Sequence, residues 1–389
     1  MKPTESYEVI KELNELCKTG KLFDVQDWIK AGKPINPKQP EKGNRRKTPL
    51  EVAIDKGSHS LVQILLEAGA VISDDRYNAL DQAISERRLD IIKLLVEHGA
   101  DVHSIDMVLV FDTWDPKIME YFIEHGADVE TDYPLAVALC YRIRTALGVL
   151  KRHKQRFPTF QEQANIALRH HSKEGNLKWV SLMLWAGADP YAAGPELDEV
   201  EIDPEDEMLC ALEYAALYDH YEIFKLKQIK LNPEHPKASE LLEYACYSKN
   251  ANLLKMLLEN GFDPSAREDG GTLLIQRCLR TMTDLWDRHP YGLGPLRNLD
   301  TDKAREKMKM IHLLAKHGAK WIPDEKTTIK DARQPLLKMM PDYTVEFIWI
   351  MSEYKASSRA LIEELIRTPS IKTVVFEHKS RINDLLDKF

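Results

Sequence analysis

The chain has 389 residues, 43% of them hydrophobic and 30% charged, with a formal net charge of −8. This composition is typical of a globular chain and excludes intrinsic disorder, and the negative charge argues against general nucleic-acid binding, which needs a basic surface. No apolar run is long enough to cross a bilayer and the first residues lack a hydrophobic signal region, so we expect a cytoplasmic protein without membrane insertion, with specialised export as the alternative.

A short pattern that ends in glycine recurs along the chain and closes an amphipathic helix each time. The copies end at Gly32, Gly69, Gly99, Gly126, Gly187, Gly261 and Gly318. Glycine suits this point because the backbone turns left-handed where a helix ends, which other residues do at a steric cost. The first four copies are 27 to 37 residues apart and the later ones 57 to 74 apart. A period near 33 residues predicts a helical solenoid, and the double steps predict a degenerate unit or an insertion.

The clearest unit covers residues 48–70. Thr48 stands where it would cap a first helix, and Pro49 occupies the first helical position, where no amide donor is needed. Gly57 ends that helix, and Gly69 ends the second one. The second helix is predicted from the apolar stripe formed by Leu61, Val62, Leu65 and Leu66.

This pattern resembles the ankyrin repeat, which has a Thr-Pro-Leu cap, a small-residue first helix, a Gly-His turn, a leucine-rich second helix and a closing Gly-Ala-Asp. Residues 78–101 follow the same pattern nearly as well, and residues 175–190 keep its second half. Fainter units open near Pro134, Cys210 and Leu241. The resemblance implies an all-α, ankyrin-type solenoid of about ten or eleven helix-turn-helix repeats with short, degenerate hairpin loops.

We expect the solenoid to occupy residues 1–326, with loop insertions near 192–208 and 281–305. Residues 327–389 are predicted to be further helical repeats or an unrelated helical cap. Gly and Pro predict a loop at 281–305, whose Trp286 and Tyr291 are costly to leave in water. These aromatic side chains are expected either to pack on the solenoid or to contact a partner.

Charge is distributed unevenly along the chain. Basic residues gather at 42–47 (Lys42, Arg45, Arg46 and Lys47) and again at 151–156, whereas residues 196–207 are almost entirely acidic. Most such runs are simply solvated. The alternative is that the acidic loop contacts a basic partner or folds back on the neighbouring basic cluster.

The five cysteines are far apart and contain no Cys-x-x-Cys pair. They are Cys17, Cys140, Cys210, Cys246 and Cys278. All fall on or beside predicted first helices, where small residues pack, so we expect unbridged buried thiols. A catalytic role for one of them is the alternative.

We find no catalytic or metal-binding motif that the helical pattern does not already explain. His98, His125 and His317 precede the closing glycines, where polar residues finish a helix. His170 and His171 with Glu174 are the nearest approach to a metal or acid–base cluster, but one helical turn supplies too few ligands for a structural zinc site. The chain also lacks a phosphate-binding loop and a Gly-x-Ser-x-Gly elbow. We therefore predict no catalytic residue, cofactor or metal, and no enzymatic activity.

Tyrosines are the candidate binding residues of the middle of the chain. In a solenoid of this kind the first helices line a concave face, and tyrosine is enriched at interfaces. The candidates on that face are Tyr141, Tyr214, Tyr218, Tyr244 and Tyr247. Tyr214 and Tyr244 hold equivalent positions and are expected to stack as a ladder. Alternatively, these rings cover the seam between repeats and expose only their hydroxyls.

Together these features predict a protein–protein interaction module that binds a protein partner on its concave face, as an adaptor, inhibitor or regulator. We expect it to be monomeric. Two alternatives stay open: a microbial effector or defence protein that recognises a foreign protein, and an array with a divergent catalytic module in its last 65 or so residues.

Overall fold

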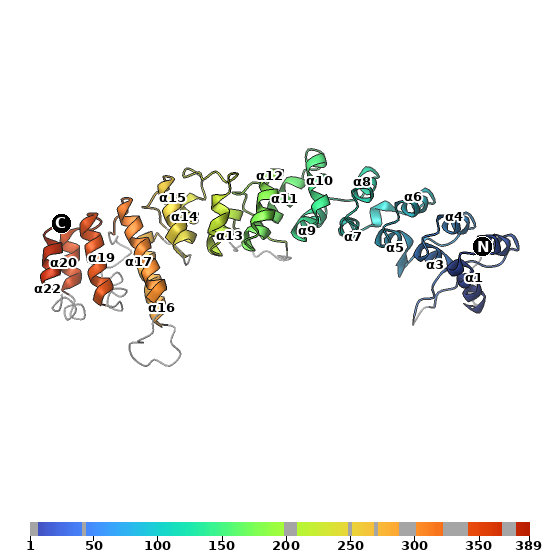
Figure 1. Ribbon diagram of the computed structural model, residues 1–389, viewed down its shortest axis with the longest axis horizontal. Coiled ribbons are helices and arrows are strands. Elements are labelled where there is room, and N and C mark those ends of the chain that lie inside the picture. Colours follow the sequence, from blue (N-terminus) through green and yellow to red (C-terminus); the bar gives the residue numbers. More distant parts are fainter. Residues whose placement is uncertain are drawn as a thin grey trace. The chain divides into compact units, whose positions relative to one another are not determined.

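The computed structural model describes residues 7–40, 44–197, 208–247, 251–267, 271–287, 301–321, 341–367 and 379–389. These residues are mostly helical, as the sequence predicts (Figure 1). Strand structure within them is limited to the hairpin of β1 (Ser73–Asp74) and β2 (Tyr77–Asn78), in which Ser73 pairs with Asn78, and to one isolated bridge. The chain divides into two units, Met1–Ala167 with Ala186–Ala188, and Leu168–Trp185 with Asp189–Phe389.

The described part of unit 1 contains five successive helix pairs. They are α1 (Tyr7–Thr19) with α2 (Leu22–Lys30), α3 (Pro49–Asp55) with α4 (His59–Glu67), α5 (Ala79–Ser85) with α6 (Leu89–Glu97), α7 (Met107–Asp112) with α8 (Pro116–Glu124), and α9 (Pro134–Cys140) with α10 (Arg144–His153). A short 3₁₀ turn, η1 (Val102–Ser104), precedes α7.

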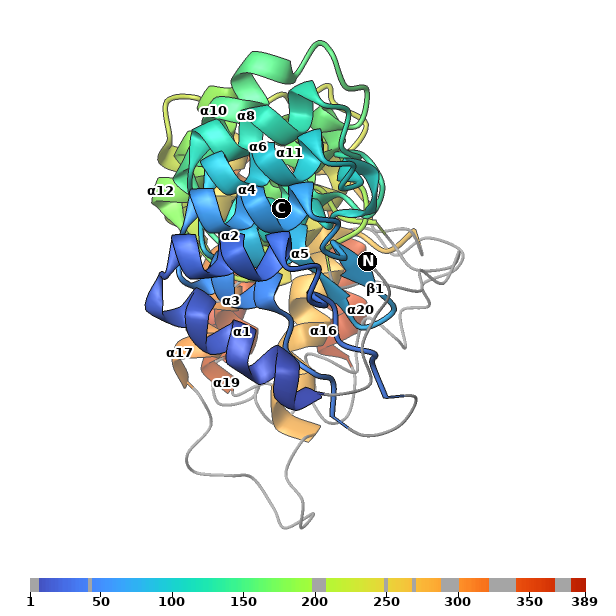
Figure 2. The same ribbon diagram turned by 90° about the vertical axis from the view of Figure 1, so that its right-hand side faces the viewer.

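These pairs stack in register. Each first helix packs on the next one, from α1 through α3, α5 and α7 to α9, and among the second helices α2 contacts α4, α4 contacts α6 and α8 contacts α10. Figure 2 shows the two rows for the first pairs, with α2, α4 and α6 in one and α1, α3 and α5 in the other. The predicted apolar stripe of α4, residues 61–66, supplies four buried side chains to the core. Unit 1 is therefore a helical solenoid.

Unit 2 continues the helix-pair pattern with less regular members. After α11 (Phe160–Lys173) and α12 (Leu177–Ala186), where the division of the chain falls, come α13 (Ala211–Leu217), η2 (Tyr221–Lys225), α14 (Ala238–Tyr247), α15 (Ala251–Glu259), α16 (Leu274–Asp287), α17 (Thr301–Lys316), α19 (Pro341–Glu353), α20 (Arg359–Ile366) and α22 (Lys379–Leu386). The first helices α13, α14 and α16 pack in succession, and η2, α15, α17 and α19 follow one another on the other side. The second helix after α13 is only the short 3₁₀ segment η2.

The closing glycines behave as the sequence predicts. All seven have a positive φ, between +69° and +105°. After α4, for example, the N–H of Gly69 donates to the carbonyl of Leu66 and that of Ala70 to the carbonyl of Leu65, so the last carbonyls of the helix are satisfied.

The turns inside helix pairs that the structure describes also contain a left-handed residue, which the sequence did not reveal in every pair. Gly57 fills this position between α3 and α4. In other pairs it is filled by Arg87, Trp114, Arg142 and Asp219, with φ between +55° and +68°. A side chain there strains the backbone, so the repeats tolerate strain at a position where their best copy has glycine.

Helix starts are satisfied in two ways. Thr48 caps α3 as predicted and forms a capping box with Glu51: its hydroxyl accepts from the N–H of Glu51 at 3.2 Å, and the Glu51 carboxylate accepts from the N–H of Thr48 at 2.9 Å. By contrast α9 has no side-chain cap of its own. Buried Gln163, from α11, accepts from the N–H groups of Leu135 and Ala136 at 2.8 and 3.1 Å. The Gln163 amide group also donates to the carbonyl of Val129 and the hydroxyl of Thr159.

The predicted insertion at 281–305 is wrong at both ends. Helix α16 continues through Asp287 and α17 begins at Thr301, so helices extend into the segment from both sides. Residues 288–300 and 198–207, the centres of both insertions, lie outside the described residues. The C-terminal region is helical where it is described, and its division into repeats or a cap stays a prediction.

Candidate functional site

A groove of about 710 Å³ lies between α1 and α3 in unit 1. It is lined by Tyr7, Lys11, Asn14, Glu15, Lys18, Lys47, Val52, Asp55 and Lys56, and we call it the α1–α3 groove. The α1 residues are spaced by four, three, one and three positions, which places them on one face of the helix. The α3 side contributes residues at the end of that short helix, together with Lys47 just before its cap. The five α1 residues could have been identified from the sequence as the polar face of the first helix.

The groove carries more positive than negative charge. Four lysines face two carboxylates, those of Glu15 and Asp55. Lys11 pairs with Glu8 at 2.6 Å, and hydrogen bonding to that carboxylate raises the pKa of the amino group. Lys18 lies 3.8 Å from Glu15. Exposed ion pairs of this kind contribute little to stability because water and salt screen them, so the amino groups are available to a ligand.

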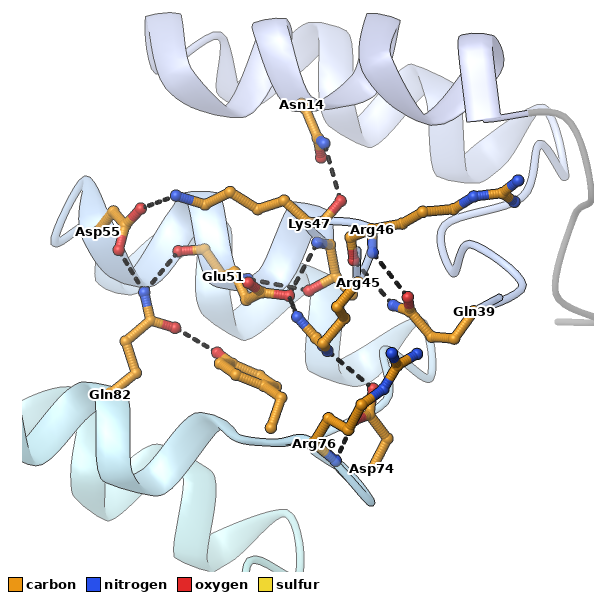
Figure 3. Close-up of polar contacts among 12 residues, drawn as sticks. Asn14, Gln39, Arg45, Arg46, Lys47, Glu51, Asp55, Asp74, Arg76 and Gln82 are labelled. Carbon is orange, nitrogen blue, oxygen red and sulfur yellow. Dashed lines mark hydrogen bonds and ion pairs between the residues drawn. The ribbon is translucent and has the colours of Figure 1, made fainter. Parts of the chain in front are cut away.

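A buried ion pair stands behind the groove and ties α3 to the β1–β2 hairpin (Figure 3). Arg45 donates to Glu51 and, at 3.1 Å, to Asp74, and its guanidinium lies 4.2 Å from the ring centroid of Tyr77. The Arg45 and Glu51 side chains are only 16% and 11% exposed. Burial opposes the charge on Arg45, but the hydrogen bonds and charges of Glu51 and Asp74 outweigh it and raise the pKa of the guanidinium.

The wall of the groove is held by a second set of contacts that joins three helix pairs. Asp55 accepts hydrogen bonds from Lys47 and from Gln82 of α5 (Figure 3). Gln82 also donates to the carbonyl of Glu51 at 3.1 Å. On the other side, the amide of Asn14 in α1 donates to the carbonyl of Lys47 at 3.0 Å. Lys47 and Asp55 are thus placed by neighbours in both directions.

The basic cluster of residues 42–47 is not one surface patch. Arg45 is largely buried in the ion pair just described, whereas Lys47 lines the groove. Arg46 donates to the carbonyl of Lys38 at 2.9 Å and lies 5.4 Å from the ring centroid of Tyr7. Lys42 lies outside the described residues.

The candidate tyrosines differ in exposure. In unit 1, Tyr141 at the end of α9 is 71% exposed. In unit 2, Tyr218 at the end of α13 is 47% exposed, but Tyr214 is only 7% exposed. The amino group of Lys173 lies 5.6 Å from the Tyr214 ring centroid and 5.9 Å from that of Tyr218. The low exposure of the Tyr214 side chain agrees with the alternative in which its ring covers the seam between repeats, and its role in partner binding stays a prediction.

The remaining aromatic candidates are less accessible or not described. Tyr244 and Tyr247 are half-buried on α14, with ring centroids 6.4 Å apart. The guanidinium of Arg277 lies 4.3 Å from the Tyr247 ring centroid. Trp286 belongs to α16, and Tyr291 lies outside the described residues. Their roles, and the Tyr214–Tyr244 ladder, stay predictions.

One donor cluster comes together in unit 2 among the residues that the structure describes. Glu174 lies 3.6 Å from His170 Nε2 and 3.7 Å from His171 Nδ1, and the three donor groups are within 4.8 Å of one another. The His171 ring is buried against Trp179, with centroids 5.3 Å apart. Three donors from one helical turn are fewer than the four of a structural zinc site, and ion pairing at the end of α11 accounts for them.

Other reactive residues match their predicted structural roles. All five cysteines are free and buried. The ring Nδ1 atoms of His98 and His125 contact the carbonyls of Leu94 and Tyr121, four residues earlier, at 2.9 and 2.7 Å. These histidines finish their helices as expected.

The stacked pairs of unit 1 match a known repeat. A family model described as ankyrin repeats, in three copies, matches residues 13–106, which include most of the lining of the α1–α3 groove. Residues 13–106 of the chain carry ankyrin repeats. Ankyrin repeats indicate a protein–protein interaction module, and most of the groove lining lies within the matched residues.

Curated relatives of the chain also carry ankyrin repeats. The chain is 28% identical over 300 residues to the ankyrin repeat and KH domain-containing protein mask-1 of Caenorhabditis elegans, an alignment of 70% of this chain and 11% of that protein. It is 25% identical over 112 residues to the ankyrin repeat protein FPV244 of fowlpox virus (strain NVSL), covering 28% of this chain and 16% of the viral protein. A mimivirus ankyrin repeat protein, R600 of Acanthamoeba polyphaga mimivirus, is 43% identical over 44 residues, 11% of this chain and 14% of the relative. The chain thus spans between 11% and 16% of the length of these relatives.

Among the helices in the described ranges, none combines the length and the apolar character that a membrane span needs.

Proposed function

We propose that this chain is a non-enzymatic adaptor, inhibitor or regulator that binds a protein partner along the first-helix side of its ankyrin repeats. The observation that carries the proposal is the α1–α3 groove, an open and charged hollow between two consecutive first helices of the repeat stack. A repeat stack buries its apolar faces between neighbours and leaves its first-helix side free for binding. The exposed ring of Tyr141, at the end of another first helix of unit 1, adds an aromatic contact of the kind that interfaces favour.

Affinity purification from the native lysate tests this proposal. The full chain should recover a defined partner, and Tyr141→Ala together with Tyr218→Ala should weaken the capture, because both rings are exposed at first-helix ends. Phe23→Ala is the matched control, since Phe23 is 77% exposed but lies on the second helix α2. Equal capture by the tyrosine variant and the wild type would overturn the assignment of these tyrosines, and equal loss in the Phe23 variant would overturn the assignment of the first-helix side.

The absence of enzymatic activity belongs to the same proposal. We assign no activity to residues 327–389. A chain that ends at Lys326 should therefore keep partner binding and every other activity of the full chain. Loss of a biochemical activity, with partner binding intact, would instead favour a catalytic module in that segment.

A further inference from the structure

The lysines of the α1–α3 groove have side chains that are accessible to solvent. The side chains of Lys11, Lys18 and Lys47 are 54%, 71% and 50% exposed. Lys56 is exposed as well and forms no ion pair with the residues that the structure describes. Glu15 and Asp55 in the lining, together with Glu8 beside Lys11, leave a surplus of one positive charge among these groups. A ligand that brings carboxylates into the groove therefore meets unbalanced positive charge.

The groove also offers apolar contact. The ring of Tyr7 and the side chain of Val52 lie among the charged groups of the lining. Its volume of about 710 Å³ is in the range of sites that enclose a ligand, about 300 to 1,000 Å³. An extended peptide sends alternate side chains to opposite sides, so a segment that mixes Asp or Glu with aliphatic residues can meet both kinds of contact.

In the wall of the groove, a ligand carboxylate can replace Asp55 as the partner of Lys47. Lys47 currently pairs with Asp55, but Asp55 also accepts from Gln82. A ligand carboxylate that takes the Lys47 amino group therefore leaves Asp55 with a hydrogen bond from Gln82. The backbone of Lys47 stays fixed by Asn14 at the same time. Exchange of one carboxylate for another at Lys47 needs no other rearrangement.

We propose that the α1–α3 groove binds an extended acidic segment of a protein partner, in which carboxylates alternate with aliphatic residues. This inference rests on the proposed function and adds the chemistry of the partner to it. A nucleic acid would also bring negative charge, but Glu15 and Asp55 in the lining and the chain's net charge of −8 disfavour a continuous polyphosphate.

Fluorescence anisotropy of the full chain with a fluorescein-labelled dodecapeptide, six repeats of Glu-Val, tests the inference. We expect saturable binding that weakens several-fold between 50 and 300 mM salt, because exposed charges are screened. The same peptide with Gln in place of Glu should bind at least tenfold more weakly. The double variant Lys18→Glu with Lys56→Glu should also lose at least tenfold in affinity. It leaves Lys47, Asp55 and the contacts behind them intact.

The matched control reverses two exposed lysines outside the groove, Lys30→Glu on α2 and Lys255→Glu on α15, for the same change in net charge. Circular dichroism and a thermal melt of both variants serve as the check that they fold. Equal binding of the Glu and Gln peptides, equal loss in the control variant, or tighter binding of a labelled twelve-nucleotide single-stranded DNA than of the acidic peptide would each overturn the inference.

Capture of the native partner separates this inference from the proposed function. Undiminished capture by the groove variant, lost only in the variant of Tyr141 and Tyr218, would keep the proposed function and refute the acidic-segment inference. Failure of every form of the chain to capture a partner would refute the proposed function, while the peptide measurement would still decide the chemistry of the groove.

Discussion

Glu213 should make the stability of the chain fall as the pH rises from acid to neutral. Its side chain is completely excluded from solvent in unit 2. The carboxylate accepts from the N–H of Cys210 at 2.7 Å and lies 3.6 Å from the amino group of Lys237. Burial raises its pKa from 4.5 to about 7, and a hydrogen bond with Glu240 adds to the rise, whereas the Cys210 amide and Lys237 oppose it.

The sign and size of the effect follow from proton linkage. Well below pH 4.5 the carboxyl group is protonated in both the folded and the unfolded chain, so the free energy of unfolding does not change with pH through this group. Between pH 4.5 and about 7 the folded chain keeps the proton that the unfolded chain has lost, so the free energy of unfolding decreases as the pH rises. Integration over these two pKa values gives a decrease of about 2 to 3 kcal/mol between pH 5 and pH 8.

Glu213→Gln tests this reasoning because glutamine has the shape of the protonated acid and can still accept from the Cys210 amide. Urea denaturation followed by circular dichroism at pH 5, 6, 7 and 8 gives the free energy of unfolding of both proteins. Relative to the wild type, the variant should gain about 2 to 3 kcal/mol of stability from pH 5 to pH 8. A difference that does not change with pH, or that changes in the opposite direction, would refute the reasoning.

Glu51→Gln is a control with the same chemistry in the equivalent capping box of α3. Because Glu51 is paired with Arg45, its neutralisation leaves a largely buried guanidinium with one partner fewer. This variant should be less stable than the wild type at every pH of the series.

Three further predictions concern buried contacts, backbone strain and thiols. Gln163→Leu should lower the free energy of unfolding by about 2 to 4 kcal/mol in urea denaturation, because it orphans two buried N–H groups of α9, whereas the exposed Gln63→Leu should have little effect. Arg87→Gly should raise the free energy of unfolding by up to about 1 kcal/mol, because Arg87 has a φ of +55°; its neighbour Glu86, with a φ of −79°, should show the opposite sign on the same substitution. Cys17, whose pKa burial raises to about 12, should not react with a thiol reagent at pH 8 in the folded chain, and all five thiols should react once the chain is denatured.

The ends of the repeats were predictable from sequence because their chemistry is local. A left-handed glycine after an amphipathic helix and a threonine cap before a helix each depend on only a few neighbouring residues. The local sequence therefore reveals the roles of Gly69 and Thr48. The strained turns at Arg87 and Arg142 did not, because no residue type marks them. There the packing of the two helices holds a conformation that the local sequence disfavours.

Features that depend on distant residues escaped prediction. The cap of α9 comes from Gln163, 28 residues beyond Leu135, so a search for a local cap fails. The burial of Tyr214 depends on the neighbouring elements of unit 2 and not on its own motif. The groove could have been found in part, since Tyr7, Lys11 and Lys18 share a helix face, but its other wall is set by the stacking of α3 on α1.

The reach of Gln163 back to α9 sets a practical limit on where the chain can be cut. A fragment that stops in the loop after His153 contains all of α9 and α10 but lacks the side chain that satisfies the first amides of α9. Such a fragment should fray at its last pair and be digested there by proteases, whereas one that extends past Gln163 keeps that end closed.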